Sequence, residues 1–387
     1  MHIVIDGRYI QDHFPGIGRY TYQLAYALTS VAPDDTFSVL CDPRAHNSRY
    51  DLNDLLSREN VREVVAPVGV LSAGQQIAIP RLLNRLKPDV YHSPYYVLPY
   101  ATSCPTVVTV HDLIPELCPE ALPRPWLRHA FRGLVRLACR RARMVIAGST
   151  ATAQDLRHRL HLPAERVATI PYGVDSSFCP PSSEQVAAMG QALRLSYPYV
   201  LYVGINKPHK NLVRLVQAWA RIPDTVRGDT RLVLAGREDP RYPQTRQAIA
   251  QLGIGNSVTI LGPVPDADMA ALYGGGVAFA FPSLYEGFGL PVLEAMACGT
   301  PVVASNRSSL PEVVGKAGLL IDPFDMDALA AALARLLGDA ALRRELSAQG
   351  LIRARRFTWE RAARETLAVY GYAPVARVVE SERGTHA

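Results

Sequence analysis

The amino-acid sequence predicts an α/β protein built from two doubly wound, Rossmann-like domains. The chain has 387 residues, which is too many for one ordinary core and suits two domains of about 180 residues each. Short apolar segments alternate with helical or loop segments along both halves, as in a parallel sheet. Each half also contains a strand, a glycine-bearing loop and a helix in succession. Two similar halves imply a cleft between the domains.

The composition is that of a globular protein without a membrane span. Hydrophobic residues make up 48% of the chain, and the mean hydropathy is +0.03. No apolar run reaches the ~18 residues of a spanning helix. The first residues, Met1–Asp6, have the composition of a strand and not of a signal peptide. We therefore expect a cytoplasmic protein.

The cysteines predict neither a metal site nor a disulfide framework. No two of them have a Cys-x-x-Cys spacing, and no cluster of metal ligands is visible in the sequence. We therefore expect buried thiols at all six positions: Cys41, Cys104, Cys118, Cys139, Cys179 and Cys298.

The first half begins with a buried strand at His2–Asp6 and a polar loop that contains Gly16 and Gly18. A helix is expected over Tyr20–Leu28, because its apolar residues recur at helical spacing. The loop lacks the third glycine of a dinucleotide fingerprint, which argues against an NAD site. A plain turn before the helix is the alternative to a binding loop. Further strands are expected at Phe37–Cys41, Val61–Ala66, Asp89–His92, Thr106–Val110 and Arg143–Ala147.

Two histidines directly follow predicted strands of this half. His111 follows Thr106–Val110, and His92 ends Asp89–His92. Ligands of doubly wound sheets bind beyond the carboxyl ends of the strands, so both positions are candidates for a site. A histidine at a strand end is also often a structural hydrogen-bond donor, and we assign His92 that role.

A basic amphipathic helix is expected over Pro125–Arg141. Arginines recur every four residues, so on a helix they form a slowly drifting stripe beside an apolar face. The stripe is either a docking surface for anionic lipids or a lipid-linked diphosphate, or the solvated face of a core helix, which we favour. Its members are Arg124, Arg128, Arg132, Arg136 and Arg140.

The second half repeats the α/β pattern after a proline- and serine-rich stretch, Cys179–Ser183, where we expect the hinge. The loop Gly204–Asn211 contains Lys207 and Lys210, two of only four lysines in a chain of net charge +6. An ammonium group there is a suitable partner for a diphosphate. Strands are expected at Tyr199–Gly204, Arg231–Gly236, Ser257–Leu261, Val277–Phe281, Pro301–Ala304 and Gly318–Ile321.

The most informative stretch lies between the predicted strand Val277–Phe281 and a predicted helix at Pro291–Cys298. Its glycines let the backbone approach a ligand, and the helix start offers free N–H groups to an anion. Glu286 and Glu294 are natural acceptors for pairs of sugar hydroxyls. Alternatively, Glu286 is a solvated loop residue and Glu294 complements the dipole of its own helix.

This stretch carries a specific resemblance. Glu286-Gly-Phe-Gly-Leu-Pro-x-Leu-Glu-Ala-Met-Ala-Cys-Gly-x-Pro-Val-Val resembles the signature of retaining glycosyltransferase family four. The resemblance covers residues 2 to 372, and it implies the GT-B architecture, with two Rossmann-like domains and a last helix that crosses back to the first. The implied domains are 1–178 on the acceptor side, 179–355 for the nucleotide sugar, and 356–387 for the crossing helix and a loose tail.

The resemblance also implies roles for single residues. Glu286 would hold hydroxyls of the donor sugar, Glu294 the ribose, and His111 the sugar from the opposite domain. Glu312 is expected to be structural. The positions that match the family's diphosphate and nucleobase contacts are Gly16, Gly18, His209, Lys210, Gly262, Val264, Gly287, Phe288, Gly289 and Leu290.

The sequence departs from the family pattern at the diphosphate loop. The family carries an arginine as well as a lysine there, whereas Ile205 and His209 occupy the two arginine positions of this chain. Lys207 or a protonated His209 would be the substitute for the second cation. For Lys207, we favour a surface charge.

The resemblance implies a metal-independent, retaining hexosyltransferase without a cofactor. Its donor would be a nucleotide diphosphate sugar, GDP-mannose before UDP-glucose, and its acceptor a hydroxyl of a glycan or a lipid-linked acceptor. The likeness is greatest to bacterial mannosyl- or glucosyltransferases of surface polysaccharides, which places the protein in the cytoplasm or at the inner face of the membrane. A nucleotide-sugar epimerase of the same fold, a nicotinamide enzyme and a non-catalytic sugar-nucleotide or lipid-binding protein are the alternatives, and no nucleic-acid partner is expected.

Overall fold

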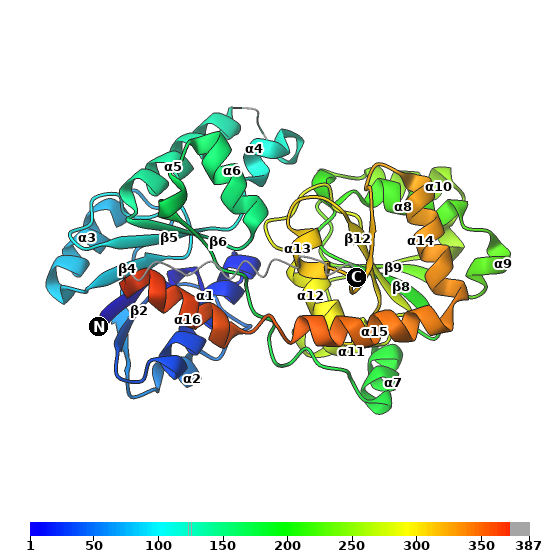
Figure 1. Cartoon of the computed structure of the whole chain (residues 1–387), viewed down its shortest axis with the longest axis horizontal. Helices are drawn as coiled ribbons and strands as arrows, with labels where there is room; N and C mark the ends of the chain where they lie inside the picture. The colour runs from blue at the N-terminus through cyan, green and yellow to red at the C-terminus, as the bar shows by residue number, and fades with distance from the viewer. Residues whose placement is uncertain (123, 125, 372–387) are drawn as a thin grey trace, which may run out of the picture.

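The computed structural model describes residues 1–122, 124 and 126–371, which form two α/β domains side by side (Figure 1). The sheet of the first domain has seven parallel strands in the order β3-β2-β1-β4-β5-β6-β7. These strands are β1 (His2–Ile5), β2 (Thr36–Cys41), β3 (Val61–Val65), β4 (Val90–Ser93), β5 (Thr106–Val110), β6 (Met144–Ala147) and β7 (Val167–Thr169).

The sheet of the second domain has six parallel strands in the order β10-β9-β8-β11-β12-β13. It repeats the topology of the first sheet without its last strand. The strands are β8 (Tyr199–Val203), β9 (Arg231–Ala235), β10 (Val258–Gly262), β11 (Ala278–Phe281), β12 (Val302–Ser305) and β13 (Leu319–Ile321).

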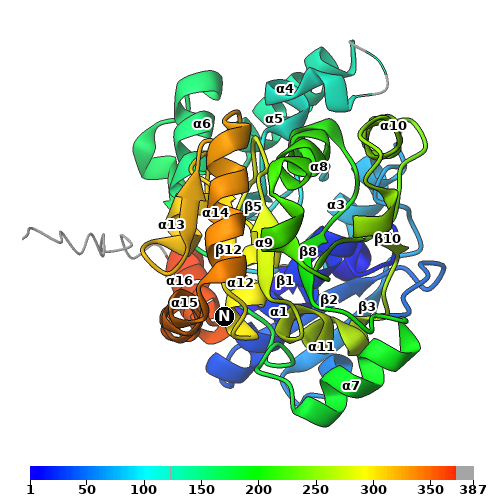
Figure 2. The same ribbon diagram turned by 90° about the vertical axis from the view of Figure 1, so that its right-hand side faces the viewer.

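Helices connect the strands of both sheets. In the first domain they are α1 (Pro15–Val31), α2 (Leu52–Leu56), α3 (Gln75–Leu86), α4 (Ile114–Leu117), α5 (Leu127–Arg141) and α6 (Thr150–Leu160). In the second they are α7 (Ser183–Ala192), α8 (Leu212–Arg221), α9 (Asp224–Arg227), α10 (Gln244–Gln251), α11 (Met269–Gly274), α12 (Leu290–Ala297), α13 (Leu310–Val314), α14 (Met326–Gly338) and α15 (Ala340–Ala354). Figure 2 shows α8 and α14, which pack against each other, from the side of the second domain.

The chain order reverses once in each sheet, between β1 and β4 in the first and between β8 and β11 in the second. At such a switch point the connections leave toward opposite faces and open a crevice beyond the strand ends. The segments that follow β8 and β11 are therefore brought together by the topology, although about 75 residues of sequence separate them (Lys210 and Glu286 lie 76 apart).

The last described helix, α16 (Trp359–Gly371), returns to the first domain and packs against α1 (Figure 1). The Tyr370 hydroxyl lies 2.6 Å from Nδ1 of the buried His92. The Trp359 ring stacks on Tyr172 with an interplanar angle of 11°. The expected crossing helix is thus confirmed, and His92 has the structural role assigned to it. The expected tail after Ala373 lies outside the described residues.

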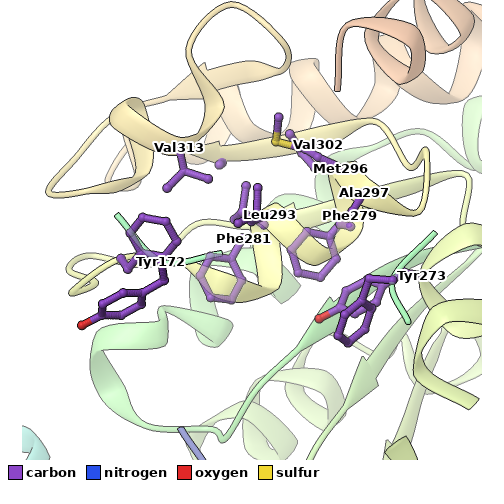
Figure 3. Packing of buried hydrophobic residues seen from close by; sticks show 14 of the residues in the cluster. Tyr172, Tyr273, Phe279, Phe281, Leu293, Met296, Ala297, Val302 and Val313 are labelled. Carbon is purple, nitrogen blue, oxygen red and sulfur yellow. The ribbon is translucent and has the colours of Figure 1, made fainter. Parts of the chain in front are cut away.

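The core of the second domain is built from β11 and the helix that follows it. Phe279 and Phe281 are buried on β11, and α12 contributes the buried Leu293 and Met296 (Figure 3). Apolar residues cover both faces of the strand, because a parallel strand between helix layers is buried on both sides. This packing fixes the loop between β11 and α12, which carries Glu286.

Three expectations about local structure were wrong. The predicted glycine loop is the first turn of α1, which begins at Pro15 because proline presets the helical φ and needs no N–H partner there. The three-residue strand β7 was not expected, since it is too short for a periodic pattern. Cys179 is exposed and Cys104 is half-buried, so the thiols are not all buried; all six cysteines are free.

Candidate active site

Lys210 and Glu286 form a partly buried ion pair at the switch point of the second sheet. Lys210 ends a 3₁₀ turn after β8, and Glu286 follows β11. The Lys210 Nζ lies 2.7 and 2.9 Å from the two Glu286 carboxylate oxygens. The side chains are only 17% and 9% exposed. Glu286 is therefore not a solvated loop residue, and the alternative raised from the sequence does not hold for it.

The loop after Glu286 presents free backbone amides. Ser309 Oγ donates to the carbonyls of Glu286 and Phe288 at 3.0 and 2.7 Å, and Ser149 Oγ donates to the Gly287 carbonyl at 2.7 Å. In a trans peptide the carbonyl and the following N–H point in opposite directions. Because these carbonyls are held by Ser149 and Ser309, the N–H groups of residues 287–289 point away from the two serines. They have no acceptor there within the described part of the chain. Free amides at the start of α12 are suited to an anion.

Gly287 brings this loop into contact with the first domain. A Cβ atom at Gly287 would lie 2.1 Å from the His111 carbonyl oxygen, so no other residue fits there without separating the two domains. Tyr285 also reaches across, and its hydroxyl donates to Asp155 at 2.7 Å. The loop that carries Glu286 is thus held from both sides of the seam.

Glu312 makes a second contact across this seam. Its carboxylate accepts the backbone N–H groups of Thr150 and Ala151 at 2.7 and 2.8 Å. It therefore caps the N-terminus of α6, a helix of the other domain, and complements the positive end of that helix. This contact agrees with the structural role expected for Glu312.

The His111 ring is held between two partners of its own domain. Nε2 lies 2.8 Å from the Pro94 carbonyl, and Nδ1 lies 2.7 Å from the Tyr172 hydroxyl. Burial lowers the His111 pKa to about 4, so the ring is neutral near pH 7. A carbonyl only accepts, so Nε2 carries the proton and Nδ1 accepts from Tyr172. The ring adjoins the seam, and both nitrogens are already engaged.

Asp112 and Lys207 are ionisable residues close enough to Lys210 and Glu286 to interact with them electrostatically. Burial raises the Asp112 pKa, and the Glu286 carboxylate adds to that effect. Lys207 is half-buried, and burial followed by the charge of Lys210 lowers its pKa. Lys207 is therefore not the solvated surface charge that we favoured from the sequence.

His209 does not supply the second cation. Its side chain is buried, and this burial lowers the pKa to about 3, with the neighbouring lysines lowering it further. A protonated His209 is therefore excluded near neutral pH. The proposal of a cationic His209 failed because the sequence could not show that the 3₁₀ turn packs this ring inward.

Glu294 is joined to the first domain by a residue that the sequence analysis missed. The Arg19 guanidinium forms an ion pair with Glu294 Oε1, and the Tyr273 hydroxyl donates to Oε2 at 2.9 Å. Glu294 is buried, so it does more than complement its helix dipole. The only signal for Arg19 in the sequence is its position directly after Gly18.

The remaining predicted positions lie at the edges of this site. Gly16 and Gly18 belong to the first turn of α1, three residues and one residue before Arg19. Gly262 ends β10 with φ of 78°, and its carbonyl accepts the Gly236 N–H at 2.7 Å. Val264 follows it and is half-buried. A pocket at the ends of β8, β9 and β10 is lined by Gly204, Asn206, Gly236, Arg237 and Ile260.

No group of three or more His, Cys, Asp or Glu side chains in residues 1–122, 124 and 126–371 is arranged to hold a metal ion. We expected no Asp-x-Asp motif, but the sequence contains two, Asp266–Asp268 and Asp325–Asp327. Asp325 caps the N-terminus of α14, and Asp266 faces Arg49 at 3.8 Å. Among the helices of the same residues, none combines the length and apolar composition that crossing a membrane requires.

Two facing Rossmann-like domains, each with a parallel sheet, define the GT-B class. The solved structures that resemble this chain include sucrose-phosphate synthase from Thermosynechococcus elongatus, with a TM-score of 0.75, 23% identity and coverage of 96% of this chain and 98% of that one. Anabaena HepE in complex with UDP and glucose has a TM-score of 0.73, 23% identity and coverage of 96% and 100%. These likenesses show the fold.

Comparison with known families identifies the chain. The profile of Glycosyltransferase Family 4 matches residues 15–178, and that of Glycosyl transferases group 1 matches residues 189–352. O-antigen chain mannosyltransferase B from Escherichia coli is 35% identical over 289 residues, which cover 74% of this chain and 75% of that protein. The chain therefore belongs to the family-four, group 1 glycosyltransferases.

Two further relatives are also named mannosyltransferases. MMP alpha-(1->4)-mannosyltransferase from Mycolicibacterium hassiacum is 35% identical over 286 residues, covering 71% of this chain and 66% of that protein. Serotype-specific mannosyltransferase WbdA from Escherichia coli is 30% identical over all of this chain, which spans only 49% of its length. The protein is accordingly a glycosyltransferase, as the sequence analysis predicted.

Proposed function

We propose that the protein transfers a mannosyl group from GDP-mannose, with UDP-glucose as the next candidate donor, to a hydroxyl of a glycan or lipid-linked acceptor with retention of configuration. The choice of mannose is supported by the names of the relatives. The observation that carries the proposal is the partly buried Lys210–Glu286 pair beside the free amides of residues 287–289. This arrangement offers cationic and N–H groups to a diphosphate and a carboxylate to sugar hydroxyls.

Departure of the nucleoside diphosphate is the step that these groups would assist. Negative charge develops on the leaving phosphate oxygen as its bond to the sugar breaks. The loop amides and the N-terminus of α12 are already oriented, so they would stabilise this charge without reorganisation, and Lys210 would join them once it leaves Glu286. When the diphosphate forms an ion pair with Lys210, the Glu286 carboxylate would become free to accept hydrogen bonds from donor-sugar hydroxyls. Glu294 would accept the ribose hydroxyls in the same way.

The acceptor would attack on the same face from which the diphosphate leaves. The bond between the sugar carbon and the phosphate oxygen breaks, the bond to the acceptor oxygen forms, and the acceptor proton passes to the leaving phosphate. His111, kept neutral by burial and held in place by Pro94 and Tyr172, would line the sugar from the first domain. No residue needs to act as a nucleophile, and we assign no role to a metal ion. Closure of the seam would exclude water, which otherwise hydrolyses the donor.

We also propose that α5 contacts an anionic membrane surface. Trp126, Leu134 and Leu137 are 57%, 38% and 37% exposed, and their spacing places them on one face of the helix. By the same spacing Arg136 and Arg140 lie beside this apolar face, and interfacial helices combine an apolar face with such flanking charges. Arg124, Arg128 and Arg140 are exposed, Arg136 is half-buried, and Arg132 instead binds the Arg159 carbonyl at 3.2 Å and faces Glu116 at 3.7 Å.

Donor turnover tests the proposed function. The protein is incubated with GDP-mannose, UDP-glucose or ADP-glucose, and release of the nucleoside diphosphate is measured with and without candidate glycan acceptors. Release from one donor, increased by an acceptor, is expected. Conversion of a donor to its epimer without acceptor would instead identify an epimerase, and binding without any turnover would identify a non-catalytic protein.

A further inference from the structure

Arg19 and Glu294 form an ion pair that connects the two domains across the predicted ribose site. Arg19 lies in the first turn of α1, and Glu294 lies in α12. Their side chains are 21% and 5% exposed. With Tyr273 on its other oxygen, each oxygen of the Glu294 carboxylate already has a protein partner. A ribose hydroxyl that binds Oε1 competes with Arg19 for that oxygen.

The surroundings of Arg19 hold its guanidinium in the seam. Its guanidinium carbon lies 5.6 Å from the centre of the Phe178 ring. The negative charge of Glu294 raises the Arg19 pKa, and the Tyr50 phenol is close enough to contribute. Tyr50 is itself stacked on Tyr22, with ring centres 4.9 Å apart. Arg19 is therefore a positioned charge and not a mobile surface side chain.

Displacing Arg19 from Glu294 would leave a poorly hydrated cation without its main partner. An unpaired charge of this kind is strongly unfavourable. Asp266, another carboxylate near Arg19, already faces Arg49. A ribose alone brings no negative charge to replace Glu294. A nucleoside diphosphate does, because its phosphates are attached to the same ribose that takes Glu294.

The loop after β8 carries Lys207 and Lys210 but no arginine. Ile205 is apolar, and His209 is neutral near pH 7 because burial lowers its pKa to about 3. Lys210 is the cation of this loop that pairs with Glu286. An arginine suits the missing position, because its planar fork binds phosphate oxygens in a bidentate manner. Arg19 approaches the seam from the opposite domain and has this chemistry.

We propose that Arg19 is a donor-binding residue that exchanges partners: it pairs with Glu294 in the nucleotide-free protein and with the diphosphate once the ribose hydroxyls take Glu294. The inference rests on the proposed use of a nucleotide diphosphate sugar. In the nucleotide-bound protein, the contact that Arg19 makes between the domains would then depend on the phosphates, since Arg19 of the first domain would be attached to the ligand in the second.

Calorimetric titrations with matched ligands test the exchange. Wild type, Arg19→Gln and Arg49→Gln are titrated with GDP, UDP and ADP and with guanosine, uridine and adenosine. Arg49 is the control, because it also forms an ion pair across the seam but not with Glu294. Arg19→Gln is expected to lower the affinity for the preferred nucleoside diphosphate about 10- to 100-fold. It should not lower the affinity for the corresponding nucleoside, because the ribose then no longer competes with Arg19 for Glu294. Arg49→Gln is expected to leave both affinities within about twofold.

The outcomes separate this inference from the proposed function. If wild type binds a diphosphate and Arg19→Gln binds it as tightly or more tightly, Arg19 only blocks the site and the inference is wrong. Equal losses for diphosphate and nucleoside would show a purely structural role and also overturn it. If folded wild type binds no diphosphate, the proposed function fails and the inference fails with it. If Arg19→Gln does not fold, Arg19→Lys is tested instead: it must lower the affinity for the diphosphate and leave the affinity for the nucleoside unchanged.

Discussion

The Lys210 ammonium lies within 2.9 Å of both oxygens of the Glu286 carboxylate. The two residues come from different connections, and they meet because β8 and β11 are neighbours across the switch point of the sheet. In the nucleotide-free protein each charge therefore neutralises the other. Under the proposed function, a sugar nucleotide would separate them by offering a diphosphate to the lysine and hydroxyls to the carboxylate.

Glu286→Gln tests the role of the carboxylate in turnover separately from the role of Lys210 in diphosphate binding. The amide keeps the shape of the side chain but removes the charge that sugar hydroxyls and Lys210 share. We expect turnover of the preferred donor to fall about 100-fold, whereas the nucleoside diphosphate binds as tightly as before or more tightly, because Lys210 is released. Steady-state kinetics and titration of the free diphosphate measure these effects. Unchanged turnover would remove Glu286 from the site.

Gly287→Ala tests the contact between the loop and the first domain. The added methyl group would lie 2.1 Å from the His111 carbonyl oxygen and 2.9 Å from Asp112 Cβ. We expect the domains to separate, with a larger radius of gyration in solution scattering and a fall in turnover of about 100-fold or more. Gly338→Ala is the matched control, because its Cβ would have no neighbour within 4 Å. Wild-type turnover in Gly287→Ala would show that closure at this point is not needed.

Acid should destabilise the folded protein before carboxylates titrate. Burial lowers the pKa values of His92, His111 and His209 to about 3, 4 and 3, from an ordinary value of 6.5. At pH values between the folded-state pKa values and 6.5, these histidines are protonated in the unfolded chain but not in the folded chain. The free energy of unfolding therefore falls as the pH falls below 6.5. Each histidine contributes about 1.4 kcal/mol per pH unit in this range.

Urea unfolding at pH 7 and pH 5 measures this dependence. His92→Gln should lose less stability than wild type between the two pH values, since it removes one of the three groups. An identical pH dependence in wild type and His92→Gln would contradict the buried, neutral state of this ring.

Flotation with liposomes tests the proposed membrane contact of α5. We expect binding to vesicles that contain anionic lipid and none to neutral vesicles. Charge reversal at Arg128 and Arg140 should abolish binding, and Trp126→Ser should weaken it, because the charged and apolar parts act together. Arg132 is left unchanged, since it binds within the protein. Unaltered flotation after both changes would eliminate this surface.

The strands and the main site loop were predictable because they depend on local patterns. β11, for example, is an apolar run of suitable length, and the glycines after it indicate close approach of the backbone. Lys210 and Glu286 each follow a predicted strand, and the general rule for doubly wound sheets brings such residues to the same edge. To predict that Lys210 and Glu286 lie close together, one needs to know only that their two strands are neighbours in the sheet.

Contacts between the domains were not predictable in the same way. Arg19 and Glu294 are 275 positions apart, and their pairing depends on how the two halves close, which no local pattern encodes. The burial of His209 depends on the packing of one 3₁₀ turn beneath the loop after β11, where the His209 carbonyl accepts the Leu284 N–H at 2.7 Å. A sequence shows the chemistry of such residues but not the surface that covers them.

The most direct test of the site is calorimetric titration of wild type and Lys210→Ala with GDP, UDP and ADP. Wild type is expected to bind one of the three clearly, with one site per chain, and GDP is the favoured candidate. Lys210→Ala should weaken that binding about 10- to 100-fold, because it removes a charge-assisted partner of the diphosphate. A folded wild-type protein that binds none of them, or a Lys210→Ala variant that binds as tightly as wild type, would contradict a diphosphate site at this seam.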